Sequence, residues 1–179
     1  MTATATEIAA LLTENPEKGF RLLVAQFSEP IYRHVRRLVV SHADAQDVTQ
    51  ETFLKILRSV NELREPGALR TWVYRIATNE ALRHLRRSFP VSCSLDEAGP
   101  DVLSLKADEY TDYSNLETVK LQRAINTLPT KQRVAFNLRY YDELDYDEIA
   151  AVTGSTASSA KVSYHIAKNR IINYMNSHD

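Results

Sequence analysis

The sequence predicts an all-α protein made of two small helical domains joined by an acidic linker. Apolar residues recur every three to four positions over long stretches, which is the period of an amphipathic helix. All 4 glycines fall between these stretches rather than inside them, as expected of helices with defined ends. No stretch alternates apolar and polar residues between turn dipeptides, as a β-hairpin would.

The composition is that of an ordinary globular protein. Of 179 residues, 44% are hydrophobic and 25% are charged, which excludes collagen-like, low-complexity and wholly disordered chains. No apolar run approaches the roughly 20 residues needed to span a bilayer, and the first residues lack the pattern of a signal peptide. The single cysteine, Cys93, cannot form an internal disulfide. We therefore expect a reduced, cytoplasmic protein.

The net charge of −1 conceals a division of charge along the chain. Residues 1–20 carry 3 acids and 1 base, residues 21–89 carry 12 bases and 7 acids, residues 90–118 carry 7 acids and 1 base, and residues 119–179 carry 8 bases and 6 acids. We expect these ranges to be an N-terminal segment, a domain, an acidic linker and a second domain. The two basic blocks indicate a polyanion or a charged protein partner, although any single cluster can be solvated surface.

Three helices are predicted in the first basic block. An apolar stripe predicts a helix over residues 20–40, which Pro30 should kink or divide. The next helix is expected to open at Asp44, whose side chain suits an N-cap, and to end before the loop 64–68. The third helix follows, and the three should enclose a core around Trp72.

Four helices are predicted in the second block, over residues 116–126, 130–140, 146–153 and 157–175. Asp145 and Glu148 have the spacing of a capping box. The last two helices form a helix-turn-helix pattern around Gly154.

The last helix is basic over most of its length. Its first turns can reach base edges in a major groove, and Lys161 and Lys168 share a face that can contact phosphates. A plain helical hairpin with a solvated basic face would show the same pattern. The polar groups concerned are Ser158, Ser159, Lys161, Ser163, His165, Lys168 and Arg170.

The third helix of the first block mixes aromatic and basic side chains. This mixture suits unpaired bases, which offer stacking faces, and the short loop 64–69 can form a pocket for a splayed base. Trp72 is expected in the core. Tyr74 and Arg75 lie off the apolar stripe and are expected to be exposed.

Polar side chains at positions 44, 47, 50 and 51 follow one side of a helix, either as a solvated face or as a surface for a protein partner. A metal site is not expected, because this helix offers no convergent third and fourth ligand. The 5 histidines are scattered, and the sequence has no zinc motif, Gly-rich phosphate loop or nucleophile elbow. We therefore expect neither an enzyme nor a bound cofactor or metal.

Taken in order, these segments resemble RNA polymerase sigma factors of the extracytoplasmic function (ECF, group IV) class of the sigma-70 family. The resemblance covers roughly residues 20–88 and 117–173, and the joint order and spacing carry it. The matching stretches are DAQDVTQETF from Asp44 to Phe53, TWVYRIATN from Thr71 to Asn79, LPTKQR from Leu128, LRYY from Leu138, YDEIA from Tyr146, and the helix from Lys161 to Arg170.

The resemblance implies an initiation factor whose domain 2 reads and melts the −10 promoter element and whose domain 4 reads the −35 element. Implied partners are core RNA polymerase (the coiled coil of β′ and the flap of β), promoter DNA and an anti-sigma factor, without insertion into a membrane. The matching polymerase-binding positions are Asp44, Asp47, Gln50, Glu51 and Phe53. The −10 positions are Arg64, Glu65, Ala68, Leu69, Tyr74, Arg75, Asn79 and Arg83. The −35 positions are Arg133, Ser158, Ser159, Lys161, Val162, His165 and Lys168.

The helix-turn-helix departs from the family pattern. Ser158-Ser-Ala160 stands where Gly-Thr-Val is usual, and Ile166 replaces a basic residue, so the −35 sequence cannot be carried over from relatives. The competing hypothesis is a stand-alone helix-turn-helix regulator, which would need neither the 44–53 segment nor the Trp72 helix. An all-helical enzyme would need a convergent polar pocket, which the sequence does not indicate.

Overall fold

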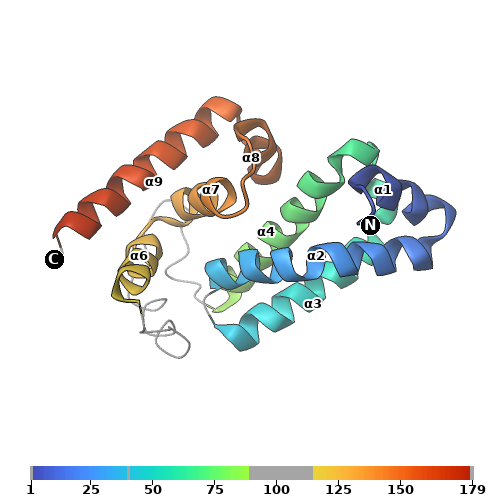
Figure 1. The fold of residues 1–179 in the computed structure, drawn as a ribbon, viewed down its shortest axis with the longest axis horizontal. Helices are drawn as coiled ribbons and strands as arrows, with labels where there is room; N and C mark the ends of the chain where they lie inside the picture. Colours follow the sequence, from blue (N-terminus) through green and yellow to red (C-terminus); the bar gives the residue numbers. More distant parts are fainter. Residues whose placement is uncertain (1, 40, 89–114, 178–179) are drawn as a thin grey trace.

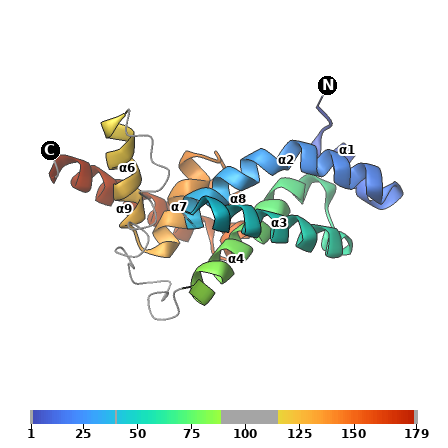
Figure 2. The same cartoon turned by 90° about the horizontal axis from the view of Figure 1, so that it is seen from below.

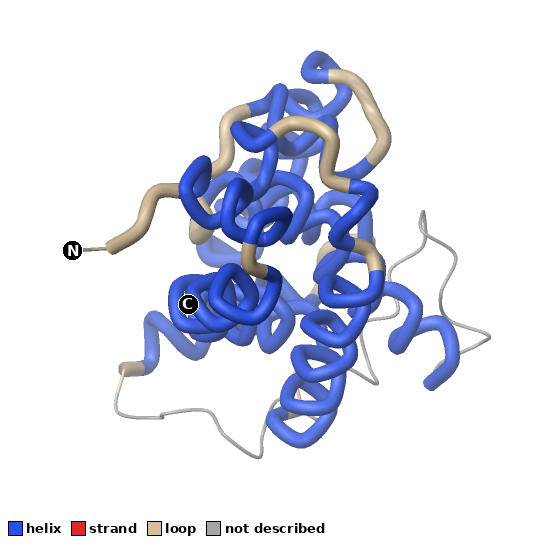
Figure 3. The backbone as a smooth tube through the Cα atoms, turned by 90° about the vertical axis from the view of Figure 1, so that its right-hand side faces the viewer, coloured by secondary structure: helices blue, strands red, loops and turns tan. Residues whose placement is uncertain are grey.

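The computed structural model describes residues 2–39, 41–88 and 115–177. Every regular element in these ranges is helical, which confirms the predicted all-α class (Figure 3). The linker expected over residues 90–118 lies largely outside the described residues, and its end, from Leu116, belongs to a helix. The elements are α1 (Ala5–Glu14), α2 (Pro16–Val39), α3 (His42–Arg58), the 3₁₀ turns Val60–Glu62 and Pro66–Ala68, α4 (Leu69–Ser88), α6 (Leu116–Asn126), α7 (Thr130–Tyr140), α8 (Tyr146–Thr153) and α9 (Ala157–Ser177).

The first domain is a bundle of α1, α2, α3 and α4 (Figure 1). Trp72 is in its core, as predicted, and Phe53 packs against the core. No helix was expected in residues 1–20, yet α1 forms there and buries Ile8 completely. The signal was present, because Thr4 and Glu7 form a capping box at its start.

Three expectations for the first domain are corrected by the structure. Gly19 lies inside α2, where an added Cβ would stand 2.5 Å from the backbone nitrogen of Leu12, so only glycine lets α1 pack this closely. The same helix is not divided at Pro30 but continues through it. Pro30 is exposed, so water can bond the carbonyl that loses its helical donor. The N-cap of α3 is Ser41, whose hydroxyl accepts from the amide of Asp44, and Asp44 itself lies in the first turn.

The second domain comprises α6, α7, α8 and α9, and the helices predicted in it are confirmed. At the start of α8 the predicted capping box is present, with both hydrogen bonds between Asp145 and Glu148 at 2.8 Å. Gly154 ends α8 with a φ of 66°, a left-handed conformation that glycine adopts without strain. Phe136 and Ile171 belong to the core of this domain.

The two domains pack directly against each other, α8 on α4 and α7 on α2 (Figures 1 and 2). Apolar side chains of the second domain, such as Leu144, Ile149 and Val152, belong to the same buried cluster as the core of the first domain. No local pattern in the sequence predicts this contact between the domains.

We predict that Gly19→Ala destabilises the protein. The new methyl group would clash with the backbone of α1, and overpacking of this kind costs about 1–3 kcal/mol. The helix propensity gained from alanine, about 1 kcal/mol, would offset part of this loss. Chemical denaturation measures the effect. Gly67→Ala is the matched control, because nothing lies within 4 Å of a Cβ there; equal stability of the two variants would contradict the prediction.

Candidate nucleic-acid interface

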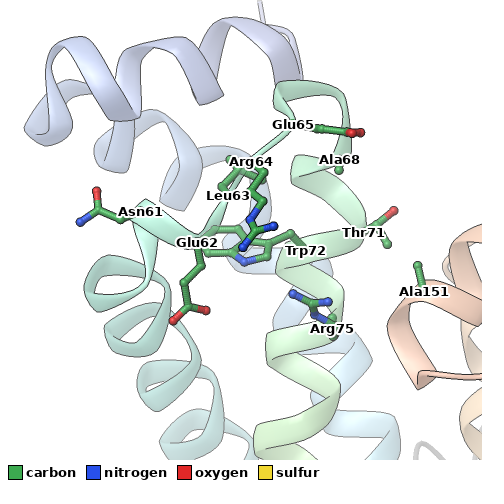
Figure 4. A pocket seen from close by; sticks show the side chains of 10 residues that line it. All are labelled: Asn61, Glu62, Leu63, Arg64, Glu65, Ala68, Thr71, Trp72, Arg75 and Ala151. Atoms are coloured by element: carbon green, nitrogen blue, oxygen red, sulfur yellow. The ribbon is translucent and has the colours of Figure 1, made fainter.

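A cavity of about 690 Å³ opens beside the loop that joins α3 to α4 (Figure 4). Its volume is in the range of roughly 300–1,000 Å³ that is usual for ligand sites. Trp72 lines it although only 5% of that residue is exposed, and the indole Nε1 is buried without a protein hydrogen-bond partner. An acceptor that entered the cavity could satisfy this N–H group, which is costly to leave unpaired.

Four of the residues predicted to bind the −10 element line this cavity, namely Arg64, Glu65, Ala68 and Arg75. Leu69 does not, because it is completely buried in the core. Sequence reasoning missed Asn61, Glu62 and Thr71, which also line it. Asn61 and Glu62 belong to a 3₁₀ turn whose position beside the cavity has no clear sequence signal.

Tyr74 was expected at the surface, and this was wrong. Only 4% of it is exposed, because the second domain covers it. Its ring meets that of His34 edge-on, with centroids 5.3 Å apart. Burial, followed by the negative charge of Asp142, raises the pKa of the Tyr74 hydroxyl from 10.0 to about 12. The hydroxyl is thus protonated at neutral pH, and the side chain does not face solvent in this arrangement.

The other predicted −10 residues lie further along α4. Arg75 is exposed, as expected. Asn79 is also exposed and lines a second cavity, of about 340 Å³, which α4 shares with Ser155 and other residues of the helix-turn-helix. Arg83 forms an ion pair with Glu80 at 2.8 Å on the surface.

The acidic side of α3 is a surface rather than a buried face. Asp47, Gln50 and Glu51 are exposed on successive turns. Oδ2 of Asp44 instead lies 3.4 Å from Nε2 of His84 in α4. The stripe continues into Leu54 and Leu57, which are 38% and 47% exposed and are not among the predicted polymerase-binding residues. A face that combines carboxylates with exposed leucines suits a protein partner better than solvent alone.

The basic face of α9 is open to solvent. Lys161, Val162, His165 and Lys168 are exposed. Ser158, Ser159 and Val162 line a third cavity, of about 440 Å³, together with Lys131 and Gln132 of α7. Ser163 faces inward and is 8% exposed. Hydroxyl, amide and ammonium groups that share one groove can contact both base edges and phosphates.

Arg133 is the exception among the predicted −35 residues. It is 1% exposed, so its guanidinium is inside the protein in this arrangement. A role at DNA would require this side chain to be uncovered first.

None of the helices in the described part of the chain is long and apolar enough to cross a membrane. In the same ranges no group of three or more His, Cys, Asp or Glu side chains is placed to hold a metal ion.

Comparison with known proteins identifies both domains. Residues 23–88 match the family model of sigma-70 region 2, and residues 118–171 match a model of sigma-70 region 4. Both regions are parts of sigma-70-type sigma factors, which defines the class of this protein.

Similar proteins narrow the class. The chain is 32% identical to the ECF RNA polymerase sigma-E factors of Salmonella typhimurium and Escherichia coli over 171 residues, covering 88% of this chain and 86% of theirs. It is 30% identical to the ECF sigma factor SigE of Mycolicibacterium smegmatis over 160 residues, which covers 87% of this chain and 61% of that protein.

Two solved structures share the fold. CnrH, in complex with the cytosolic domain of CnrY, superposes with a TM-score of 0.73 at 21% identity and covers 98% of this chain and 100% of that one. RpoE of Bartonella quintana, in complex with the anti-sigma factor NepR, gives 0.70 at 19% identity over 90% of this chain and 99% of that one.

The chain therefore belongs to the ECF sigma factors of the sigma-70 family. It is an alternative sigma factor, acting in transcription initiation, and not a stand-alone helix-turn-helix regulator.

Proposed function

We propose that this protein, a cytoplasmic sigma factor of group IV, binds core RNA polymerase and directs it to promoters without catalysis, cofactor or metal of its own. Residues 21–89 would act as domain 2, with α1 attached to it, and residues 119–179 as domain 4. The observation that carries the proposal is the cavity beside the α3–α4 loop. It brings two arginines, two carboxylates and the edge of Trp72 to one place, which suits a base taken out of the stack.

Each surface has a proposed partner. The acidic stripe of α3 would bind the coiled coil of the polymerase β′ subunit, and the second domain would lie near the β flap. The cavity of the first domain would hold a base of the −10 element, and the α9 groove would read the −35 element. An anti-sigma factor would cover one of these faces or hold the two domains together, a partner suggested by the complex of RpoE with NepR.

The polymerase contact predicts that charge reversal on α3 prevents association. Asp47→Arg combined with Glu51→Arg replaces two exposed carboxylates and should abolish co-elution with purified core polymerase in size-exclusion chromatography. Glu14→Arg combined with Asp147→Arg changes the net charge equally at exposed positions elsewhere. Loss of co-elution in both double variants, or in neither, would sink the assignment of this face.

The −10 cavity predicts a defect in promoter opening when it is filled. Ala68→Phe places a ring in the cavity without touching the core, because Ala68 is partly exposed. Permanganate reactivity of the −10 region should fall at least tenfold while closed-complex binding is retained. Gly67→Ala, in the same turn, should open the promoter normally. Full opening with Ala68→Phe would rule out base capture here.

The α9 groove predicts selective loss of duplex binding. Lys161→Ala and His165→Ala should each weaken promoter affinity by about 1–3 kcal/mol, the usual value of a base or phosphate contact. Polymerase association should be unaffected. Arg123→Ala removes one exposed positive charge from α6 and should have little effect. Equal weakening of polymerase and promoter binding would contradict the role of this groove.

A further inference from the structure

One carboxylate of the second domain is bound by side chains of the first domain. Asp142 follows α7, and its side chain is only 4% exposed. Its Oδ2 lies 2.9 Å from Nδ1 of His34, and its Oδ1 accepts from Arg37 at 2.7 Å. The guanidinium of Arg70 donates to the backbone carbonyl of the same residue. We call these four residues the Asp142 cluster.

The first-domain side of this cluster is itself held in place. His34 is fully buried, and its Nε2 lies 2.8 Å from the hydroxyl of Thr78. The threonine hydroxyl can donate or accept, so both ring nitrogens are bonded in either charge state. Within the first domain, Thr78 therefore orients the His34 ring that faces Asp142. The Arg37 guanidinium also stacks over the ring of Tyr141 of the second domain, 4.5 Å from its centroid, which is a further contact between the domains.

The carboxylate depends on the closed arrangement. A buried charge is tolerated only when it is paired and hydrogen-bonded, and the side-chain partners found for Asp142 in the described chain come from α2 and α4. Closure has a cost as well, because Nε of Arg37 is buried without a partner. Separation of the domains would return the Asp142 carboxylate and the Arg37 guanidinium to water, so the closed form can open reversibly.

The closed arrangement cannot engage a promoter as proposed above. Elements centred on −10 and −35 are about 25 base pairs apart, or about 85 Å at roughly 3.4 Å each. Here Asn79 of α4 and Ser155 of the helix-turn-helix line one cavity of about 340 Å³. Ala151 of the second domain stands at the rim of the −10 cavity (Figure 4). Tyr74 of the first domain is buried beside Asp142 of the second.

We propose that the Asp142 cluster is an intramolecular latch that holds the free sigma factor closed and unable to contact both promoter elements. The block on DNA rests on the proposed function, whereas the closure itself does not. Any partner that binds the two domains at separate places, as polymerase would, has to break these contacts. Because only the open molecules bind DNA, the apparent affinity for DNA equals the affinity of the open form multiplied by the open fraction.

The test compares the shape of the full chain in solution. Asp142→Ala removes the acceptor from the second domain, and Arg37→Met removes a donor from the first while keeping an apolar stem. Each should increase the radius of gyration in small-angle X-ray scattering, with helicity unchanged by circular dichroism. Asp147→Ala and Arg33→Met are the controls, because they remove equivalent exposed charges from α8 and α2, and they should keep the wild-type radius.

Two variants on different domains separate opening from unfolding. Expansion of both, with full helicity, supports the latch. A wild-type radius in both variants overturns it, as does expansion of the controls to the same extent. An open variant should also bind a promoter duplex more tightly than wild type in the absence of polymerase. If the variants open but neither they nor the wild type bind polymerase or promoter, the latch stands and the proposed function fails.

Discussion

A carboxylate withdrawn from water has to find positive or hydrogen-bonding partners, and this requirement determines how the two domains meet. The apolar side chains at the interface, such as Ile149 and Val152, favour contact but tolerate many relative positions, because hydrophobic attraction has no direction. The bonds from His34 and Arg37 to Asp142 are directional and charge-assisted. They select one arrangement from the many that burial alone would allow.

Each domain nevertheless packs apolar side chains among its own helices, beside the buried cluster that the two domains share. The first is closed by α1 to α4 around residues such as Leu23 and Trp72, and the second has its own cluster around Phe136 and Ile171. The chain between Ser88 and Asn115 can reach about 90 Å when fully extended at roughly 3.3 Å per residue. This reach is comparable to the distance between the two promoter elements, so two folded domains can serve both sites once they separate.

Local signals in the sequence predicted local structure well. The capping box at Asp145 and the left-handed position at Gly154 both depend on residues close in sequence, and both are confirmed. Gly19 was wrongly expected at a helix boundary, because its role is to let two helices approach closely. Tyr74 was wrongly expected at the surface, because the residues that bury it belong to the second domain, far along the chain. Helical periodicity describes one helix at a time and carries no information about such a partner.

Sequence motifs likewise carry no information about how the two domains pack, so they describe the DNA-bound state whereas the structure describes a closed one. The family resemblance implies that Tyr74 and Asn79 contact DNA, whereas the closed structure buries Tyr74 and places Asn79 at the interdomain cavity. A side chain cannot occupy both environments at once, so under the proposed function closure and promoter binding compete for these two residues. Linkage then requires that whatever stabilises the closed form weakens DNA binding by the same free energy. In the Asp142 cluster, His34 and Asp142 are 108 residues apart in sequence. Substitutions in this cluster can shift the balance between the closed form and DNA binding without altering a DNA-reading side chain.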